Sequence, residues 1–394
     1  MPRILRIINR FNLGGPTYNA AYLTKYLPPE YETMLLGGMK DETEDSSQFI
    51  VENLGITPTV LHEMHREINI FNDAAAYRKI KKIIAEFKPD IVHTHASKPG
   101  ALGRWAAHRM NVPVIIHTFH GHVFHSYFSS AKTTFYKSLE RKLAEVSTRI
   151  IAISEKQKEE LSIDHQICPP DKIEVIPLGF DLNRFQDGII KKREVFREEF
   201  SLAEDDIAVS IVGRLVPIKN HKLFLDSMKW VKARVNRRIK GFIVGDGESR
   251  TNLENYCTEI GLTYSSDSED EVDIYFTSWV KNVDFVNSGS DIIALTSKNE
   301  GTPVSLIEAQ AGNRAIVSTR VGGIEDVVIP DETALLSDPN NADAFRQNLL
   351  KLASDDDLRR ALGERGWLFV KDKFHYERLA RDVATLYERL LADF

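Results

Sequence analysis

Short apolar runs that alternate with amphipathic segments constrain the fold of this chain more than any other feature. Strands are expected at 4–9, 33–38, 90–95, 113–121, 148–154 and 172–181, with helices at about 16–27, 74–90 and 131–146. The pattern begins again near residue 206, with strands expected at 206–215, 240–248, 272–279, 291–297 and 315–321 and a helix at 223–235. Strands alternating with helices are typical of parallel βαβ units. The sequence therefore predicts an α/β protein made of two consecutive doubly wound, Rossmann-like halves.

The stretch between the two halves, 182–201, is polar and charged, which suits a domain boundary. A chain of 394 residues is also too long for one ordinary core. We predict an N-terminal domain over 1–185 and a C-terminal domain over 186–374. The last segment, 375–394, has the spacing of an amphipathic helix.

Composition excludes some classes of function. The formal net charge of −6 provides no global basic field for nucleic acid, so no nucleic-acid partner is expected. Two cysteines are too few for a disulfide framework and suit a reducing cytoplasm. The sequence has no run of 18 uninterrupted apolar residues, and its start lacks the apolar core of a signal peptide. We therefore expect a soluble, cytoplasmic protein.

One glycine-bearing loop follows the first strand of each half. Gly14 and Gly15 let the backbone approach a ligand closely, and Pro16 suits the first turn of a helix whose free N–H groups can face a phosphate. The alternative is an ordinary tight turn, and the dinucleotide pattern G-x-G-x-x-G is not met. In the second half, Arg214 and Lys219 lie on one short loop that begins at Gly213. Together they can neutralise a diphosphate, with two solvated loop cations as the alternative.

The segment from Glu300 to Ala309 predicts a second phosphate site at a helix start. Thr302 can cap this helix with Pro303 at its first position, which leaves the N–H groups of the next residues, Val304 and Ser305, free for phosphate oxygens. Glu300 precedes the helix and Glu308 lies in its second turn. One carboxylate could contact a sugar and the other the ribose hydroxyls. The alternative is a capped helix with two surface glutamates.

Four histidines, His117, His120, His122 and His125, follow a strand of the first half. Zinc would need firmer ligand spacing, so no metal site is predicted. We expect one histidine at the strand tip to position or polarise a reacting sugar. Structural hydrogen bonding is the expectation for His117, His122 and His125.

Five motifs in order resemble those of glycosyltransferase family 4, the retaining enzymes of GT-B fold, over nearly the whole chain. They are NLGGP (12–16), TFHGHVF (118–124), VIPLGFDLNRF (175–185), GRLVPIKNH (213–221) and EGTPVSLIEA (300–309). The last resembles the E-x7-E element of that family. The sequence departs from the family at Gly312-Asn313-Arg314, where Gly-Lys-Pro is commoner.

The resemblance implies two Rossmann-like domains facing a central cleft, an acceptor-side N-terminal domain, a nucleotide-sugar-binding C-terminal domain and a last helix that crosses back to the first. It implies that Gly14 and Gly15 line the donor phosphates and the acceptor, and that His120 hydrogen-bonds the donor sugar. Arg214 and Lys219 would hold the diphosphate, Glu300 would orient the sugar ring and Glu308 would bind ribose. Further donor-binding positions are Gly213, Gly301, Thr302, Pro303, Val304 and Ser305.

The implied reaction is transfer, with retention, of a hexose or N-acetylhexosamine from a nucleotide-diphosphate sugar to a glycan or lipid-linked acceptor. UDP is expected as the nucleotide of the donor because it is common in the family. The expected pathway is cell-envelope polysaccharide synthesis. No metal or cofactor is expected. The alternatives are a GT-B nucleotide-sugar 2-epimerase, a Rossmann oxidoreductase, and an inactive sugar-nucleotide-binding partner. The basic amphipathic segments 131–146 and 74–88 leave open peripheral contact with the inner face of a membrane, against an ordinary solvated face.

Overall fold

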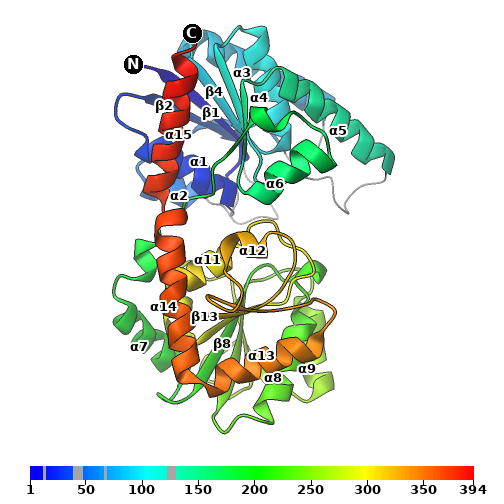
Figure 1. The fold of residues 1–394 in the computed structure, drawn as a ribbon, viewed down its shortest axis with the longest axis vertical. Coiled ribbons are helices and arrows are strands. Elements are labelled where there is room, and N and C mark those ends of the chain that lie inside the picture. The colour runs from blue at the N-terminus through cyan, green and yellow to red at the C-terminus, as the bar shows by residue number, and fades with distance from the viewer. Residues whose placement is uncertain (12–14, 39–47, 66–68, 122–129) are drawn as a thin grey trace. The chain divides into compact units, whose positions relative to one another are not determined.

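The computed structural model describes residues 1–11, 15–38, 48–65, 69–121 and 130–394, and the chain divides into two compact units (Figure 1). The first unit contains residues 1–180 and 373–394, and the second contains residues 181–372. The sequence placed this division at 185 and 375. Arg184 shows why the second unit begins earlier, because its side chain pairs with Asp284.

The first unit contains a sheet of seven parallel strands, in the order β3-β2-β1-β4-β5-β6-β7. The strands are β1 Arg3–Arg10, β2 Glu32–Gly38, β3 Thr59–Leu61, β4 Ile91–His95, β5 Val114–Thr118, β6 Arg149–Ala152 and β7 Ile173–Val175. The winding direction reverses between β1 and β4. In doubly wound sheets, ligands bind beyond the carboxyl ends of the strands at such a reversal.

Helices cover both faces of this sheet because neighbouring residues of β1 point to opposite sides. Ile4 packs with α1 (Gly15–Tyr26) and α15 (Tyr376–Leu391), whereas Leu5 packs with α3 (Ile70–Phe87) and α4 (Ser97–Arg109). The remaining helices are α2 Gln48–Asn53, α5 Ser130–Glu145 and α6 Glu155–Glu159.

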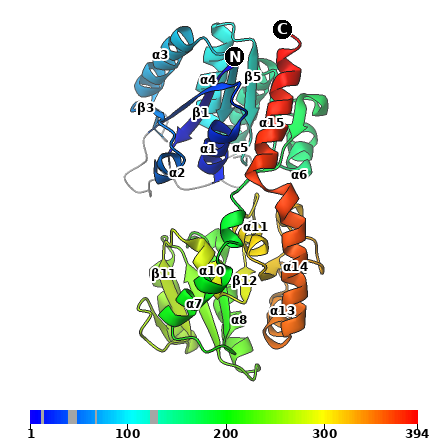
Figure 2. The same ribbon diagram turned by 90° about the vertical axis from the view of Figure 1, so that its left-hand side faces the viewer.

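Helix α15 joins the C-terminal end of the chain to the first unit, beside α1 (Figures 1 and 2). Its buried residues Leu379, Val383, Tyr387 and Leu390 recur at helical spacing on one face. The amide of Tyr376 donates to the carbonyl oxygen of Phe180 at 3.1 Å. The amphipathic pattern of 375–394 thus does form a helix, and its apolar face completes the core over β1 and β4.

The second unit repeats the architecture with seven parallel strands in the order β10-β11-β9-β8-β12-β13-β14. These strands are β8 Ile207–Val212, β9 Ile239–Val244, β10 Tyr264–Ser265, β11 Ile274–Ser278, β12 Ile292–Leu295, β13 Ala315–Thr319 and β14 Leu335–Ser337. The winding direction reverses between β8 and β12. The prediction of two doubly wound parallel sheets is confirmed.

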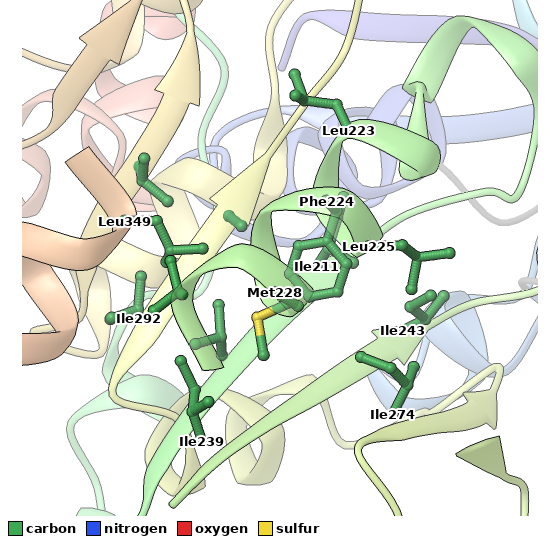
Figure 3. Close-up of a cluster of buried hydrophobic side chains, with 14 of the residues drawn as sticks. Ile211, Leu223, Phe224, Leu225, Met228, Ile239, Ile243, Ile274, Ile292 and Leu349 are labelled. Carbon is green, nitrogen blue, oxygen red and sulfur yellow. The ribbon is translucent and has the colours of Figure 1, made fainter. Parts of the chain in front are cut away.

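Its helices are α7 Ile189–Glu199, α8 His221–Lys232, α9 Arg250–Ile260, α10 Val283–Gly289, α11 Val304–Ala311, α12 Ile324–Val327, α13 Ala342–Ser354 and α14 Asp356–Lys373. Helices α8, α9 and α13 cover one face, where Phe224 and Met228 pack over Ile211 and Ile243 (Figure 3). On the opposite face α7 and α10 pack against the sheet through Phe196 and Val286.

Three expectations from the sequence need correction. The strand expected over 172–181 is only β7, because Pro177 has no N–H for a ladder and the amide of Phe180 donates instead to the carbonyl oxygen of Phe374 at 2.8 Å. Helix α3 begins at Ile70 and not at 74, since the side chain of Asn69 caps it. The polar stretch 182–201, which suited a domain boundary, lies within the second unit and contains α7. Within the described ranges, no helix is both long and apolar enough to cross a bilayer.

Candidate active site

The loops that follow β8 and β12 are joined by an ion pair. Lys219 ends a short 3₁₀ turn that starts at Pro217, and its Nζ lies 2.6 Å from Oε1 of Glu300. The hydroxyl of Ser297 donates to the same oxygen at 2.5 Å. Only 10% of the Glu300 side chain is exposed. Lys219 and Glu300, which the sequence assigned to one donor site, therefore lie side by side at the reversal of the second sheet.

Backbone contacts hold the loop that carries Arg214. The amide of Leu215 donates to the carbonyl oxygen of Asp246 at 3.0 Å, and a Cβ on Gly245 would lie 2.1 Å from the carbonyl oxygen of Gly213. The Arg214 side chain is exposed, and it has no ion pair or hydrogen bond to any residue that the structure describes. A fixed backbone thus presents a guanidinium with its donors unused, as an anion site requires.

Helix α11 begins one residue later than the sequence predicted. Pro303, with φ −74° and ψ 96°, is the N-cap, so Thr302 is not the cap and Pro303 is not the first helical residue. The reason is the ψ angle of Pro303, which is extended and cannot continue into the helix. Across the described part of the chain, the backbone N–H groups of Gly301, Thr302, Val304 and Ser305 have no acceptor. Unpaired amides at a helix start can bind phosphate oxygens.

Two glycines after β13 pack closely against the backbone of this segment, and the sequence analysis did not single them out. The amide of Gly323 donates to the carbonyl oxygen of Glu300 at 3.1 Å. A Cβ on Gly322, whose φ is +54°, would lie 1.9 Å from that same oxygen, and one on Gly323 would lie 2.1 Å from the carbonyl oxygen of Gly301. The pair Gly322-Gly323 could have been suspected from its place just after the strand predicted over 315–321.

Glu308 lies one turn into α11 and differs from Glu300 in its surroundings. Burial raises the pKa of its carboxyl group to about 7, with Arg184 lowering it and Asp284 raising it. Asp284 is itself held by Arg184 and by Lys192, whose Nζ is 2.9 Å away. Among the described residues no group donates a hydrogen bond to the Glu308 carboxylate. This acceptor is therefore available to hydroxyl groups such as those of a ribose.

In the first unit, His120 follows β5 and contacts a second histidine. Its Nε2 lies 2.9 Å from Nδ1 of His95, the last residue of β4, and the two rings stack with centroids 5.2 Å apart. Burial lowers the pKa of His120 to about 3, so the ring is neutral at physiological pH. Gly15 is the first residue of α1, at the carboxyl end of β1, whereas Gly14 lies outside the described residues.

The other histidines of that cluster divide into two groups. His117 is buried and its Nδ1 lies 2.9 Å from Oγ1 of Thr94, which confirms the expected structural hydrogen bonding. His122 and His125 fall in the range 122–129, outside the described residues. His95 was missed, although its place at the carboxyl end of a strand could have indicated it. In the parts of the chain that are described, no three His, Cys, Asp or Glu side chains form a cluster suited to a metal ion.

Comparison with known proteins identifies the class that this fold represents. HepE from Anabaena, crystallised with UDP, superposes with a TM-score of 0.79 at 16% identity, covering 98% of this chain and 100% of that one. A glycosyltransferase from Rickettsia africae superposes with a TM-score of 0.79 at 20% identity, covering 100% of this chain and 99% of that one. Two seven-stranded parallel sheets of this kind define the GT-B fold of glycosyltransferases.

Sequence comparison then gives the family. The model for Glycosyltransferase Family 4 matches residues 13–184, and the model for glycosyl transferases group 1 matches residues 192–367. An Escherichia coli UDP-Gal:alpha-D-GlcNAc-diphosphoundecaprenol alpha-1,3-galactosyltransferase is 31% identical over 294 residues, 74% of this chain and 73% of that one. The capsular polysaccharide biosynthesis glycosyltransferase CapM of Staphylococcus aureus is 25% identical over 84% of each chain. The chain belongs to glycosyltransferase family 4, and the resemblance inferred from its motifs is confirmed.

Proposed function

We propose that the protein is a retaining transferase that moves a hexose or N-acetylhexosamine from a UDP-sugar to a glycan or lipid-linked acceptor in cell-envelope polysaccharide synthesis. The observation that carries this proposal is the set of anion-binding groups on the second unit. Exposed Arg214, Lys219 and the unpaired amides of 301–305 lie on neighbouring loops at the carboxyl ends of β8 and β12. Two cations and a helix start suit a diphosphate.

The proposed chemistry needs no nucleophile from the protein. As the bond from the sugar C1 to the diphosphate oxygen breaks, negative charge grows on the diphosphate, and Arg214, Lys219 and the amides oppose it. The acceptor oxygen forms its bond to C1 on the same face, and the acceptor proton passes to the departing phosphate oxygen. We propose that these fixed positive groups stabilise the leaving group without a metal ion.

The remaining roles follow the family pattern. We propose that Glu308 accepts hydrogen bonds from the ribose hydroxyls and that Glu300 orients the sugar ring. His120, with Gly14 and Gly15 of the same unit, would contact the donor sugar and its phosphates. The name of the Escherichia coli relative makes UDP-galactose the first donor to test and a polyprenyl diphosphate GlcNAc the first acceptor.

The test is a transfer assay with a panel of UDP-sugars and a short-chain polyprenyl diphosphate GlcNAc. UDP release and product mass would be measured with and without EDTA, and NMR would give the anomeric configuration of the product. We expect transfer with retention that EDTA leaves unchanged. Inversion, loss of turnover in EDTA, or conversion of the donor without acceptor would contradict the proposal. Donor binding without transfer or hydrolysis would indicate an inactive binding protein.

Peripheral membrane contact stays a prediction. Helix α5 bears exposed Phe135 and, further along, Arg141 and Lys142, but Nε and Nη2 of Arg141 donate to the carbonyl oxygens of Gln166 and His165 at 2.8 and 2.9 Å. Part of the basic side-chain set of this helix is thus used within the first unit. Co-sedimentation with anionic liposomes at low and high salt tests the contact, and absence of binding at low salt would remove it.

A further inference from the structure

Three imidazole rings form a continuous column inside the first unit. His93 and His95, on β4, are fully buried, and their ring centroids lie 4.3 Å apart. The ring of His95 stacks in turn on that of His120, with centroids 5.2 Å apart. Burial holds the pKa values of His93 and His95 well below the ordinary histidine value, so both rings are neutral. Each therefore carries one proton, whose position the surrounding donors and acceptors decide.

The position of the proton on His93 follows from Arg6, whose guanidinium can only donate hydrogen bonds. The guanidinium of Arg6 has no acceptor, so its Nη2 donates to the Tyr387 hydroxyl oxygen at 3.2 Å. Tyr387 in turn donates its own proton to Nδ1 of His93, 2.6 Å away. His93 consequently carries its proton on Nε2 and donates it to Oγ1 of Thr118 at 2.7 Å. The base of the column is thus fixed by Tyr387, a residue of α15.

The contact between His95 and His120 allows two arrangements, because one proton must lie between Nδ1 of His95 and Nε2 of His120, which are 2.9 Å apart. If His120 donated, the proton of His95 would sit on its Nε2. That atom is buried and has no hydrogen-bond partner among the described residues. A buried N–H without an acceptor costs more than a bare lone pair. If His95 donates, its Nε2 is only a bare lone pair, and the unpaired N–H is Nδ1–H of His120, which is buried as well. The two arrangements differ in reach: the His95 side chain is fully buried whereas His120 is only partly buried, so a bound ligand can supply an acceptor to the N–H of His120 and not to that of His95.

We infer that His95 is a positioning residue that holds His120 with its proton on Nδ1, so that His120 acts toward the donor sugar as a neutral hydrogen-bond donor and not as a base. This inference rests on the proposed function, since it gives His120 a sugar oxygen as its partner. Nδ1 of His120 is buried and, within the described ranges, unpaired. With Nε2 already accepting from His95, His120 has no free lone pair for the acceptor proton. The proton must go to another group, which agrees with its transfer to the leaving phosphate.

Substitutions at His95 separate this role from a packing role. His95→Asn keeps an N–H donor near the position of Nδ1, whereas His95→Phe keeps the stacked ring and removes the hydrogen bond. We expect His95→Phe to lower kcat by roughly 10–100-fold, as expected for a misplaced contact group, with the donor KM near the wild-type value. His95→Asn should restore most of the turnover. His117→Asn is the matched control, because it replaces another buried histidine of the same unit that is held by Thr94.

The tautomer itself is measured on the full chain with 15N-labelled histidine, by long-range 1H–15N correlation, with His120→Asn used to assign the His120 signals. We expect the wild-type protein to carry the His120 proton on Nδ1, His95→Asn to preserve this and His117→Asn to leave it unchanged. A wild-type proton on Nε2, or full turnover in folded His95→Phe, would overturn the inference. If the wild-type protein transferred no sugar, the proposed function would fail, while the spectrum would still decide where the His120 proton lies. If His95→Phe did not fold, the wild-type and His95→Asn spectra would decide in the same way.

Discussion

The ammonium group of Lys219 lies 2.6 Å from Oε1 of Glu300, so a cation and an anion that were both assigned to the donor site neutralise each other in this structure. Arg214 has no such partner among the residues described, and its charge is uncompensated. A diphosphate entering the site would have to share Lys219 with Glu300. The two cations of this loop therefore differ in their expected contribution to the stability of the folded protein. Substituting each one by alanine distinguishes its effect on stability from its effect on turnover.

We predict that Lys219→Ala and Arg214→Ala both lower turnover, by about 10²–10³-fold, because each removes positive charge facing the leaving diphosphate. Their effects on stability should differ. Lys219→Ala leaves the largely buried Glu300 carboxylate without its cation and should cost about 1–3 kcal/mol in the free energy of unfolding, whereas Arg214→Ala should stay within about 0.5 kcal/mol. Steady-state kinetics and urea unfolding measure the two quantities.

The control for this pair is Arg360→Ala, which removes an exposed arginine of α14 whose one ion pair among the described residues is with exposed Asp357. Such surface pairs contribute little, so both turnover and stability should be unchanged. Near-wild-type transfer by either Arg214→Ala or Lys219→Ala would contradict the proposal that Arg214 and Lys219 bind the diphosphate.

A second prediction concerns Gly322. Its φ of +54° disfavours any side chain, and a Cβ would lie 1.9 Å from the carbonyl oxygen of Glu300. Gly322→Ala should therefore cost at least about 2 kcal/mol of stability, because backbone must move on both sides of the contact. Gly301→Ala is the matched control, since a Cβ there meets no atom within 4 Å. Thermal unfolding that showed equal losses of stability for the two variants would argue that the close packing of Gly322 against Glu300 is not required.

Much of the fold could be predicted because its elements follow simple periodicities. The apolar runs predicted the strands except β3, β10 and β14, which are only two or three residues long, and the spacing of 375–394 predicted α15. Helix α4 could not be found in this way, because its buried face includes Pro99, Gly100, Gly103 and Arg104, which resemble a loop in sequence. Its glycines are explained only by tertiary contacts: a Cβ on Gly100 would lie 2.5 Å from the ring of His117, and one on Gly103 would lie 2.7 Å from the Thr94 side chain.

The candidate site, like the fold, could be predicted only in part from the sequence. Motifs indicated Arg214, Lys219, Glu300 and Glu308 because their residue types suit a sugar nucleotide. One of the groups that hold them, the amide of Gly323, which donates to the carbonyl oxygen of Glu300, acts through a contact between loops that are distant in sequence. Sequence spacing does not reveal which strand ends are neighbours. His95 was missed for this reason, since its contact with His120 depends on β4 lying next to β5.

A third prediction tests the link from α15 to the first sheet. Tyr387→Phe removes the hydroxyl that accepts from Arg6 and donates to His93, leaving both buried groups without that partner. We expect a loss of about 1–3 kcal/mol in the free energy of unfolding. Tyr26→Phe is the control, because Tyr26 is 37% exposed and its ring, which packs 4.2 Å from that of Tyr376, is retained. Equal stability of Tyr387→Phe and wild type would show that the hydrogen bonds to Tyr387 do not contribute.

The last prediction uses the pKa of Glu308, which burial raises to about 7 from the ordinary value of 4.5. An acid whose pKa is higher in the folded state stabilises the fold in its protonated form, so this contribution is complete below pH 4.5 and is lost as pH rises to about 7. Relative to Glu308→Gln, the wild-type protein should lose up to about 3 kcal/mol between pH 4.5 and 7, with no further change above. Urea unfolding of both proteins at several pH values measures this difference.

UDP binding should change in the opposite direction, because the ionised carboxylate is the better acceptor for ribose hydroxyls. UDP affinity measured by calorimetry should rise with pH through about 7 in the wild-type protein beyond any rise in Glu308→Gln, and parallel curves for the two proteins would remove Glu308 from the ribose site.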